Sequence, residues 1–175
     1  TLFRSCEVTV LPAYTKPEDI LNGGYDGIML SNGPGDPEEN TEIIENLKVL
    51  TKSGMPIFGI CLGHQLLALS IGAKTKKMVF GHRGVNHPVK DLAHDRTYIT
   101  SQNHGYAVLG ETVNPEIARV SHININDNTC EGIEHLHAPI FTVQYHPEVK
   151  PGPEDTAYLF DQFIALMDEK KGGAQ

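Results

Sequence analysis

The chain has 175 residues, of which 39% are apolar and 21% charged, and its formal net charge is −8. These values are typical of one globular domain, and they exclude a disordered chain and a long coiled coil. No apolar run reaches the roughly 18–20 residues that span a bilayer, and the acidic balance argues against a nucleic-acid-binding surface. The three cysteines are widely scattered, which favours a cytoplasmic protein with reduced thiols over a disulfide scaffold.

The first half of the chain alternates short apolar runs with helical patterns. Strands are predicted at residues 7–11, 26–30 and 55–60, and helices at residues 38–51 and 62–71. Glycine and proline end the helices, at Gly54 and Pro56 for the first and at Gly72 for the second. This alternation predicts an α/β fold with a wound, mostly parallel sheet and flanking helices.

The second half is richer in β-structure and predicts a small antiparallel extension of the sheet. Strands are predicted at residues 74–79, 85–90, 96–100, 105–108, 117–125, 129–135 and 139–144, and a last helix at residues 154–169. Only six residues precede the first predicted strand. We therefore expect a strand and a helix to be missing upstream, and residues 1–175 to form one truncated domain.

Cys61 follows a buried strand in the sequence FGICLGHQ and opens a helix, with Gly59 and Gly63 on either side. Such a frame allows the strained turn of a nucleophile elbow, here with sulfur in place of a serine oxygen. A helix N-terminus favours thiolate, and the amide of Leu62 is placed to stabilise an oxyanion. The alternative is a small core cysteine, the commoner fate of a lone cysteine.

A nucleophilic thiol requires a base and an acceptor that orients the base. His146 ends a predicted strand, and Glu148 follows two residues later, beyond Pro147. Sites in parallel sheets lie at such strand ends, so we expect His146 to serve Cys61 and Glu148 to bond the far imidazole nitrogen. Because the chain has nine histidines, a loop histidine with a solvated glutamate stays open as the alternative.

Residues 31–37, SNGPGDP, form a third strand end with a glycine-rich turn. Its backbone N–H groups are candidates for an anion or oxyanion cradle, with a plain turn as the alternative. Residues 81–84 and 101–106 are polar stretches between predicted strands, suited to substrate contacts or to turns. His135 and His137 share a strand face as metal ligands do, but no further ligand cluster completes a set, so no metal site is expected.

Together these segments resemble the class I glutamine amidotransferase domain, a flavodoxin-like fold, from about Cys6 to Met167. The motifs that carry the resemblance are SNGPGD at 31–36, GICLGHQ at 59–65 and QYHPE at 144–148. It implies that Cys61 is the nucleophile, His146 the acid and base, and Glu148 the partner of His146. The residues that match the glutamine and oxyanion contacts of the family are Gly33, Gly35, Leu62, Gln65, Asn103, Gly105 and Tyr106.

Within the family, residues 80–92, 101–106 and 151–155 are similar to the small-subunit branch of carbamoyl-phosphate synthase. This implies hydrolysis of L-glutamine through a γ-glutamyl thioester and transfer of ammonia to the large synthetase subunit, which joins it to bicarbonate. ATP and magnesium then belong to that partner, and this domain holds no cofactor and contacts neither nucleic acid nor membrane. We expect the N-terminal domain of the small subunit, which helps cover the glutamine pocket in the family, to be missing from this chain.

Three alternatives remain at this stage. The chain could be the amidotransferase domain of another synthetase or a free-standing γ-glutamyl cysteine hydrolase. The alternative from another class is a non-catalytic scaffold that regulates a synthetase.

Overall fold

The computed structural model describes residues 2–3, 6–149 and 156–173. Its strands are β1 (Leu2–Phe3), β2 (Cys6–Glu7), β3 (Ile28–Leu30), β4 (Ile57–Ile60), β5 (Thr75–Asp91), β6 (Arg96–Val108), β7 (Ala118–Asn124), β8 (Cys130–His135) and β9 (Ile140–Val143). Its helices are α1 (Pro17–Asn22), α2 (Thr41–Leu50), α3 (Leu62–Ser70) and α4 (Tyr158–Gly172), with 3-10 turns η1 (Pro37–Glu39) and η2 (Gly110–Thr112).

The main sheet has seven strands in the order β3-β4-β9-β8-β6-β5-β7. Strands β3, β4 and β9 are parallel, and every other pairing in this sheet is antiparallel. The prediction of a mostly parallel sheet with a small antiparallel extension is therefore wrong in proportion. The strands from β5 to β9 follow one another through short connections, and such connections join antiparallel neighbours, whereas parallel strands need a long crossover.

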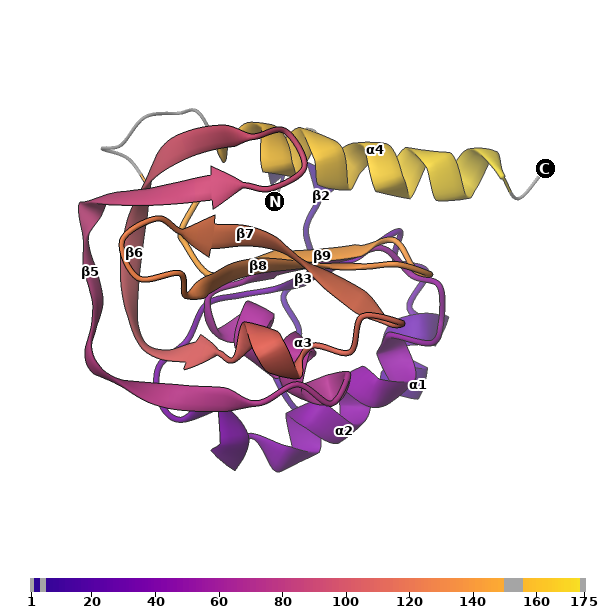
Figure 1. Ribbon diagram of the computed structural model, residues 1–175. Coiled ribbons are helices and arrows are strands. Elements are labelled where there is room, and N and C mark those ends of the chain that lie inside the picture. Colours follow the sequence, from indigo (N-terminus) through magenta and orange to yellow (C-terminus); the bar gives the residue numbers. More distant parts are fainter. Residues whose placement is uncertain (1, 4–5, 150–155, 174–175) are drawn as a thin grey trace.

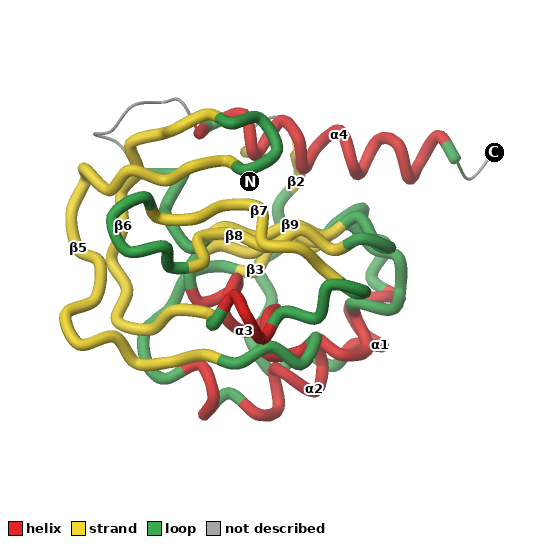
Figure 2. The backbone as a smooth tube through the Cα atoms, viewed as in Figure 1, coloured by secondary structure: helices red, strands yellow, loops and turns green. Residues whose placement is uncertain are grey.

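Strands β5, β6, β8 and β7 close into a ring, which we call the β-ring (Figure 2). Strand β7 pairs with both β5 and β8, and β6 pairs with both β5 and β8. The long strands β5 and β6 bend around one side of the molecule, and their pairing shifts register between Lys77 and His82 and again between Gly84 and His87. Such bulges increase the local twist and allow a sheet to curl.

Helices cover both faces of the parallel strands: α4 lies on one face, and α1, α2 and α3 lie on the other (Figure 1). Successive side chains of β4 point to opposite faces. Phe58 stacks on Phe141, with ring centroids 4.5 Å apart, and packs with Phe160 of α4. Its neighbour Ile57 packs in the opposite cluster with Leu47 of α2. Burying each such side chain contributes about 1.5–3 kcal/mol, so β4 anchors both layers.

The predicted helices and most strands are present with shifted ends. Residues 74–79 and 85–90 are parts of the single strand β5, and 96–100 and 105–108 are parts of β6. The polar stretches at 81–84 and 101–106 therefore lie within strands and not between them, which corrects the prediction. The last helix begins at Tyr158, while its predicted start at residues 154–155 lies outside the described residues, as does segment 151–155.

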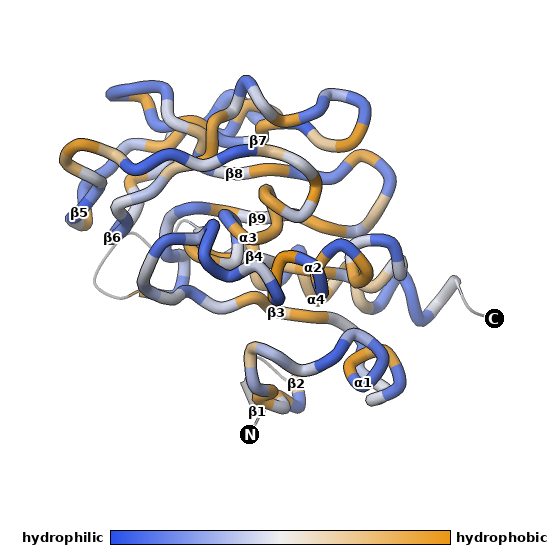
Figure 3. The backbone as a smooth tube through the Cα atoms, turned by 90° about the horizontal axis from the view of Figure 1, so that it is seen from below, coloured by the Kyte–Doolittle hydropathy of each residue, from blue (hydrophilic) through white to orange (hydrophobic). Residues whose placement is uncertain are grey.

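The N-terminal prediction fails in part. Only Cys6–Glu7 is a strand, and it pairs with β1. In the predicted strand at 7–11, Val10 is 89% exposed and Val8 and Leu11 are also exposed, so these residues have no buried face to select a strand. The short helix α1, with Pro17 at its first position, was not predicted. Seen from below, β1 and β2 lie at one end of the molecule and β7 lies near the other end, with α1 and β3 between them (Figure 3).

Candidate active site

Three loops meet at the carboxyl ends of β3, β4 and β9. Leu30 pairs with Gly59 and Ile60 pairs with Val143, so the residues that follow these strands emerge side by side. A cavity of about 580 Å³ lies there, lined by the three loops and by residues of β5 and β6. Of the ten residues predicted for the site, all but Leu62 line this cavity. The convergence expected from the strand ends is thus present in the fold.

Cys61 lies in the sharp turn between β4 and α3. Its backbone has φ 53° and ψ −103°, in a region that residues other than glycine rarely occupy. The turn is held by a hydrogen bond from the Cys61 amide to the Val143 carbonyl, 2.9 Å. A Cβ on Gly59 would lie 2.9 Å from the backbone of Gly63, and one on Gly63 would lie 2.4 Å from the Leu30 carbonyl oxygen. Both glycines are therefore needed for close packing around the elbow.

His146 and Glu148 form a hydrogen-bonded pair beside this turn. The Nδ1 atom of His146 donates to Glu148 Oε1 at 2.8 Å, and the side chain of His146 is 9% exposed. The His146 amide donates to the carbonyl of Ser101 on β6 at 2.9 Å. His146 is thus held at its backbone by β6 and at its imidazole by Glu148. Its Nε2 atom is buried and has no hydrogen-bond partner among the described residues in this resting state.

The electrostatics of His146 favour its charged form. Interaction with the Cys61 sulfur, and then the bond to Glu148, raise the pKa of His146 to about 9 against the opposing effect of burial. The imidazole is therefore a cation at neutral pH. Its Nε2 proton is available to an atom that lies next to the Cys61 sulfur. A cation at this place also stabilises negative charge on Cys61.

The glycine-rich loop after β3 forms another wall of the cavity. Gly35 has φ +98°, a conformation that favours glycine. A Cβ on Gly33 would lie 2.7 Å from Cδ2 of Leu62, so the Leu62 side chain packs on this loop, away from the cavity. Asp36 ends the loop by accepting the Glu38 amide at 3.0 Å and begins η1. The loop is thereby fixed at two points, by packing at Gly33 and by a hydrogen bond at Asp36.

Gln65 projects from α3 and is nearly fully buried. Its Nε2 donates to the Tyr106 carbonyl and to Gln144 Oε1, both at 2.9 Å. These two bonds tie α3 to β6 and to the end of β9. Because both amide protons are used, only Oε1 of Gln65 remains to meet a ligand, and it can only accept a hydrogen bond.

Asn103, Gly105 and Tyr106 line the cavity from within β6. Along this strand Ser101 and Asn103 are more exposed than Gln102 and His104, as expected for side chains that alternate between two faces. Interaction with Asp36 of the glycine-rich loop raises the pKa of the Tyr106 phenol. The tyrosine thus connects β6 to the glycine-rich loop.

Sequence reasoning did not assign Arg83, Ser101 and His104 to the site, although all three line the cavity. They lie in the polar stretches that were predicted to be connections. The side chains of residues 100–104 alternate between buried and more exposed positions, as they do in a strand. All five residues are polar, so an alternation in hydropathy that would predict the strand is missing from the sequence.

Among the described residues, one group of side chains has donor atoms close enough to hold a metal ion: His82, His104 and Glu131. They lie within the β-ring. His135 and His137 lie elsewhere, with imidazole centroids 6.2 Å apart, and His137 Nε2 donates to the Glu116 carbonyl. No helix in the described part of the chain has both the length and the hydropathy to cross a membrane.

Comparison with known proteins points to the family that the three motifs resemble. The sequence model of the family described as glutamine amidotransferase class-I matches residues 2–166. The chain is 53% identical over 166 residues to the carbamoyl phosphate synthase small chain of Symbiobacterium thermophilum, covering 94% of this chain and 46% of the relative. It is 56% identical over 172 residues to the small chain of Bacillus caldolyticus, covering 97% and 47%. The chain therefore spans about half the length of the curated relatives it matches.

Two solved structures share the fold at low identity. One is described as a GMP synthase protein from Thermoplasma acidophilum, with a TM-score of 0.79 at 21% identity over 94% of this chain and 82% of that one. The other is a glutamine amidotransferase from Thermotoga maritima, with a TM-score of 0.61 at 19% identity over 85% and 66%. The family match covers nearly the whole chain, and the protein belongs to the class I glutamine amidotransferase family.

Proposed function

We propose that this chain hydrolyses the side-chain amide of L-glutamine and passes the ammonia to a synthetase subunit that forms carbamoyl phosphate from bicarbonate and ATP. The observation that carries the proposal is the His146–Glu148 pair at 2.8 Å beside Cys61, whose backbone is strained at the edge of the cavity. The relatives named carbamoyl phosphate synthase small chain support the synthetase. The large subunit of that enzyme is the proposed partner, and the cytoplasm, where thiols stay reduced, is the proposed compartment.

In the first half of the reaction the Cys61 sulfur attacks the amide carbon of glutamine. A carbon–sulfur bond forms, and the carbonyl oxygen takes up negative charge, which the amides of Gly33 and Leu62 are proposed to stabilise. Each such donor contributes about 3–4 kcal/mol. His146 gives its Nε2 proton to the amide nitrogen, the carbon–nitrogen bond breaks, and ammonia leaves a γ-glutamyl thioester on Cys61.

In the second half His146 removes a proton from water as the water attacks the thioester carbon. The carbon–sulfur bond breaks, glutamate leaves, and the sulfur recovers its starting state. Glu148 holds the imidazole by Nδ1 throughout, which keeps Nε2 directed at the reacting atoms.

Binding of the glutamine backbone is assigned to the opposite walls of the cavity. The free Oε1 of Gln65 is suited to accept a hydrogen bond from the α-ammonium group. Asn103, Gly105 and Tyr106 line the same wall from β6, and Gly35 leaves space on the facing loop. These assignments follow the family positions and the unused acceptor of Gln65.

The test is glutamine-dependent and ammonia-dependent synthesis by the complex of the full chain with the large subunit. Cys61→Ala is expected to lower glutamine-dependent carbamoyl phosphate formation by at least about 10³-fold, while synthesis from added ammonia is retained. Cys130→Ala is the matched control, since Cys130 is buried in a separate cluster, and it is expected to retain both activities.

Other outcomes would replace the proposal. Equal loss of both activities in Cys61→Ala would overturn the division of labour between the subunits. A different amidated product, or glutamine hydrolysis that no partner alters, would identify another synthetase or a free-standing hydrolase. A wild-type Cys61 that does not turn over glutamine in the complex would identify a scaffold.

A further inference from the structure

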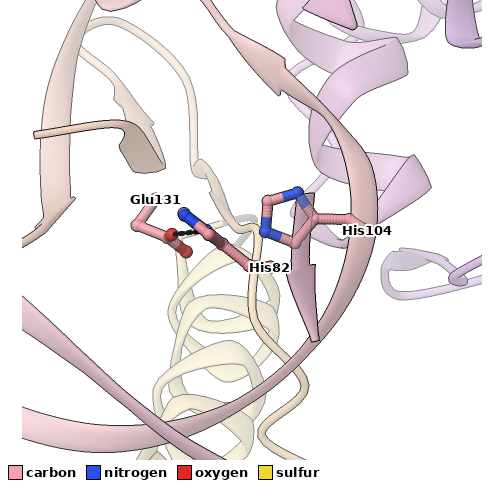
Figure 4. Close-up of side chains that lie close together, drawn as sticks. All are labelled: His82, His104 and Glu131. Carbon is pink, nitrogen blue, oxygen red and sulfur yellow. Dashed lines mark ion pairs between the residues drawn. The ribbon is translucent and has the colours of Figure 1, made fainter. Parts of the chain in front are cut away.

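The interior of the β-ring holds a cluster of side chains that the proposed reaction does not use. His82 of β5, His104 of β6 and Glu131 of β8 point toward one another (Figure 4), and one donor atom from each lies within 4.8 Å of the others. All three are buried, and Glu131 is fully buried. The sequence alone could not indicate this group, because its members lie on three strands with no motif spacing between them.

The two imidazoles are held from behind. His82 Nε2 lies 3.0 Å from Asp127 Oδ2, and His104 Nδ1 lies 2.7 Å from the Tyr106 carbonyl oxygen. A carbonyl oxygen only accepts, so His104 carries its proton on Nδ1. Its other nitrogen, Nε2, is the one that faces the cluster. A carboxylate or carbonyl behind the outer nitrogen is the arrangement that orients metal-bound histidines.

Asn124 Nδ2 donates to Glu131 Oε1 at 3.3 Å, but the inner face of the cluster still holds acceptors without a donor. Glu131 Oε1 lies 3.3 Å from His82 Nδ1, and Glu131 Oε2 has no hydrogen-bond partner among the described residues. Gln102 Oε1 lies 2.8 Å from His104 Nε2 and 3.0 Å from His82 Nδ1. Two facing acceptors and an unpaired buried carboxylate oxygen are costly unless a cation lies between them.

We propose that His82, His104 and Glu131 form a binding site for a divalent transition-metal ion, with Zn²⁺ as the first probe. Two imidazole nitrogens and one carboxylate oxygen are a common set for this class of ion. Gln102 Oε1 is placed for a fourth bond. The 3.3 Å between the His82 and Glu131 donors matches neighbouring ligands of one ion, and a small movement of His104 completes the set.

A proton is the competing cation. The bond to Glu131 and the nearby Asp127 raise the pKa of His82 to about 9, so a protonated His82 could lie between two carboxylates with no metal. The two states differ in what is measured. A metal site binds one ion per chain with nitrogen and oxygen ligands, whereas a proton-only cluster binds none.

The experiment uses the full chain, stripped of metal with a chelator and titrated with Zn²⁺ and, separately, Co²⁺. We expect one Zn²⁺ per chain by elemental analysis, and a Co²⁺ absorption spectrum without a thiolate band. Glu131→Gln is expected to weaken Zn²⁺ binding by at least about 100-fold, as loss of a ligand does. Cys61→Ala and His137→Asn are matched controls that are expected to bind as the wild type does.

The spectrum of the wild-type chain keeps the test decisive even if a variant fails to fold. Absence of Zn²⁺ binding to the wild-type chain would overturn the proposal in favour of the protonated cluster. A Co²⁺–thiolate band, or binding lost in Cys61→Ala and kept in Glu131→Gln, would locate the ion at Cys61 and would equally overturn it. Neither result bears on glutamine hydrolysis, which is tested separately.

Discussion

Cys61 holds a backbone conformation with positive φ, which costs on the order of 1–3 kcal/mol for a residue with a side chain. The surrounding structure compensates for this cost. The Cys61 amide is bonded to β9, and Gly63 lets α3 pack directly on the end of β3. The strained turn places Cys61 in the lining of the cavity, together with His146. A strained elbow beside an oriented imidazole is the combination that the proposed chemistry needs.

Glu148→Gln tests the charge of the His146 pair at this scale. The Cys61 sulfur and this carboxylate raise the pKa of His146 to about 9, so the imidazolium that is proposed to protonate the leaving amide nitrogen persists up to about that pH and is lost above it. Without the carboxylate this pKa falls, and the basic limb of the kcat/KM profile for glutamine should move to lower pH. Activity should also fall by about 10²-fold or more.

The measurement is the glutaminase pH profile together with an NMR titration of His146. Glu134→Gln is the matched control, because Glu134 is an exposed carboxylate that pairs with Arg119. An unchanged basic limb in Glu148→Gln would show that Glu148 does not set the proton affinity of His146.

At the scale of elements, α3 carries the site because its first turn contacts three strands. Gly63 allows contact with β3, Gln65 bonds to β6, and His64 lies 2.8 Å from Thr142 Oγ1 on β9. These three consecutive positions leave little freedom for Cys61, which precedes them. The position of the proposed nucleophile is therefore set by packing between elements as much as by its own turn.

Gly63→Ala should disturb this packing measurably. The new Cβ would lie 2.4 Å from the Leu30 carbonyl oxygen, and backbone must shift to relieve the contact, at a cost of about 1–3 kcal/mol of unfolding free energy. Gly172→Ala in α4 is the control, since a Cβ there has no neighbour within 4 Å. It should be neutral or slightly stabilising. Denaturant unfolding compares the two variants, and equal stability would refute the packing argument.

At the scale of the whole molecule, buried neutral histidines make stability depend on pH. Burial lowers the pKa of His64 to about 3 from an ordinary 6.5, and it also lowers the pKa of His104 and His122. The unfolded chain then binds more protons than the folded chain below pH 6.5. The part of the stability that these three histidines contribute is therefore complete above that pH and is lost as the solution is acidified.

His64→Gln isolates one of these contributions. Each pH unit below 6.5 should cost the wild type about 1.4 kcal/mol through His64, or roughly 2 kcal/mol between pH 7 and pH 5. The variant should have lower stability at pH 7 but a shallower loss over the same interval. Unfolding free energies at both pH values provide the comparison. Parallel losses in the two proteins would mean that His64 is not held neutral.

The sequence predicted the convergence of the three motif loops better than it predicted the sheet. Glycine or proline lies close to the strand ends before residues 31, 61 and 146. These signals do not depend on the order of the strands in the sheet, so the convergence of the three motifs could be expected. The β-ring could not, because its closure depends on pairing between β7 and β5 and on a single pair between Val108 and Cys130. Polar residues on both faces of β5 and β6 also concealed these strands, since they border the cavity on one side and the buried cluster on the other.

The most direct measurement is the identity of the atom that carries the γ-glutamyl group. The full chain is mixed with glutamine, quenched in acid during turnover and digested, and the peptides are analysed by mass spectrometry. We expect a γ-glutamyl thioester on the peptide that contains Cys61, removed by hydroxylamine and absent from Cys61→Ala. Glutamine turnover with Cys61 unmodified, or with the adduct on Cys130, would show that Cys61 is not the nucleophile.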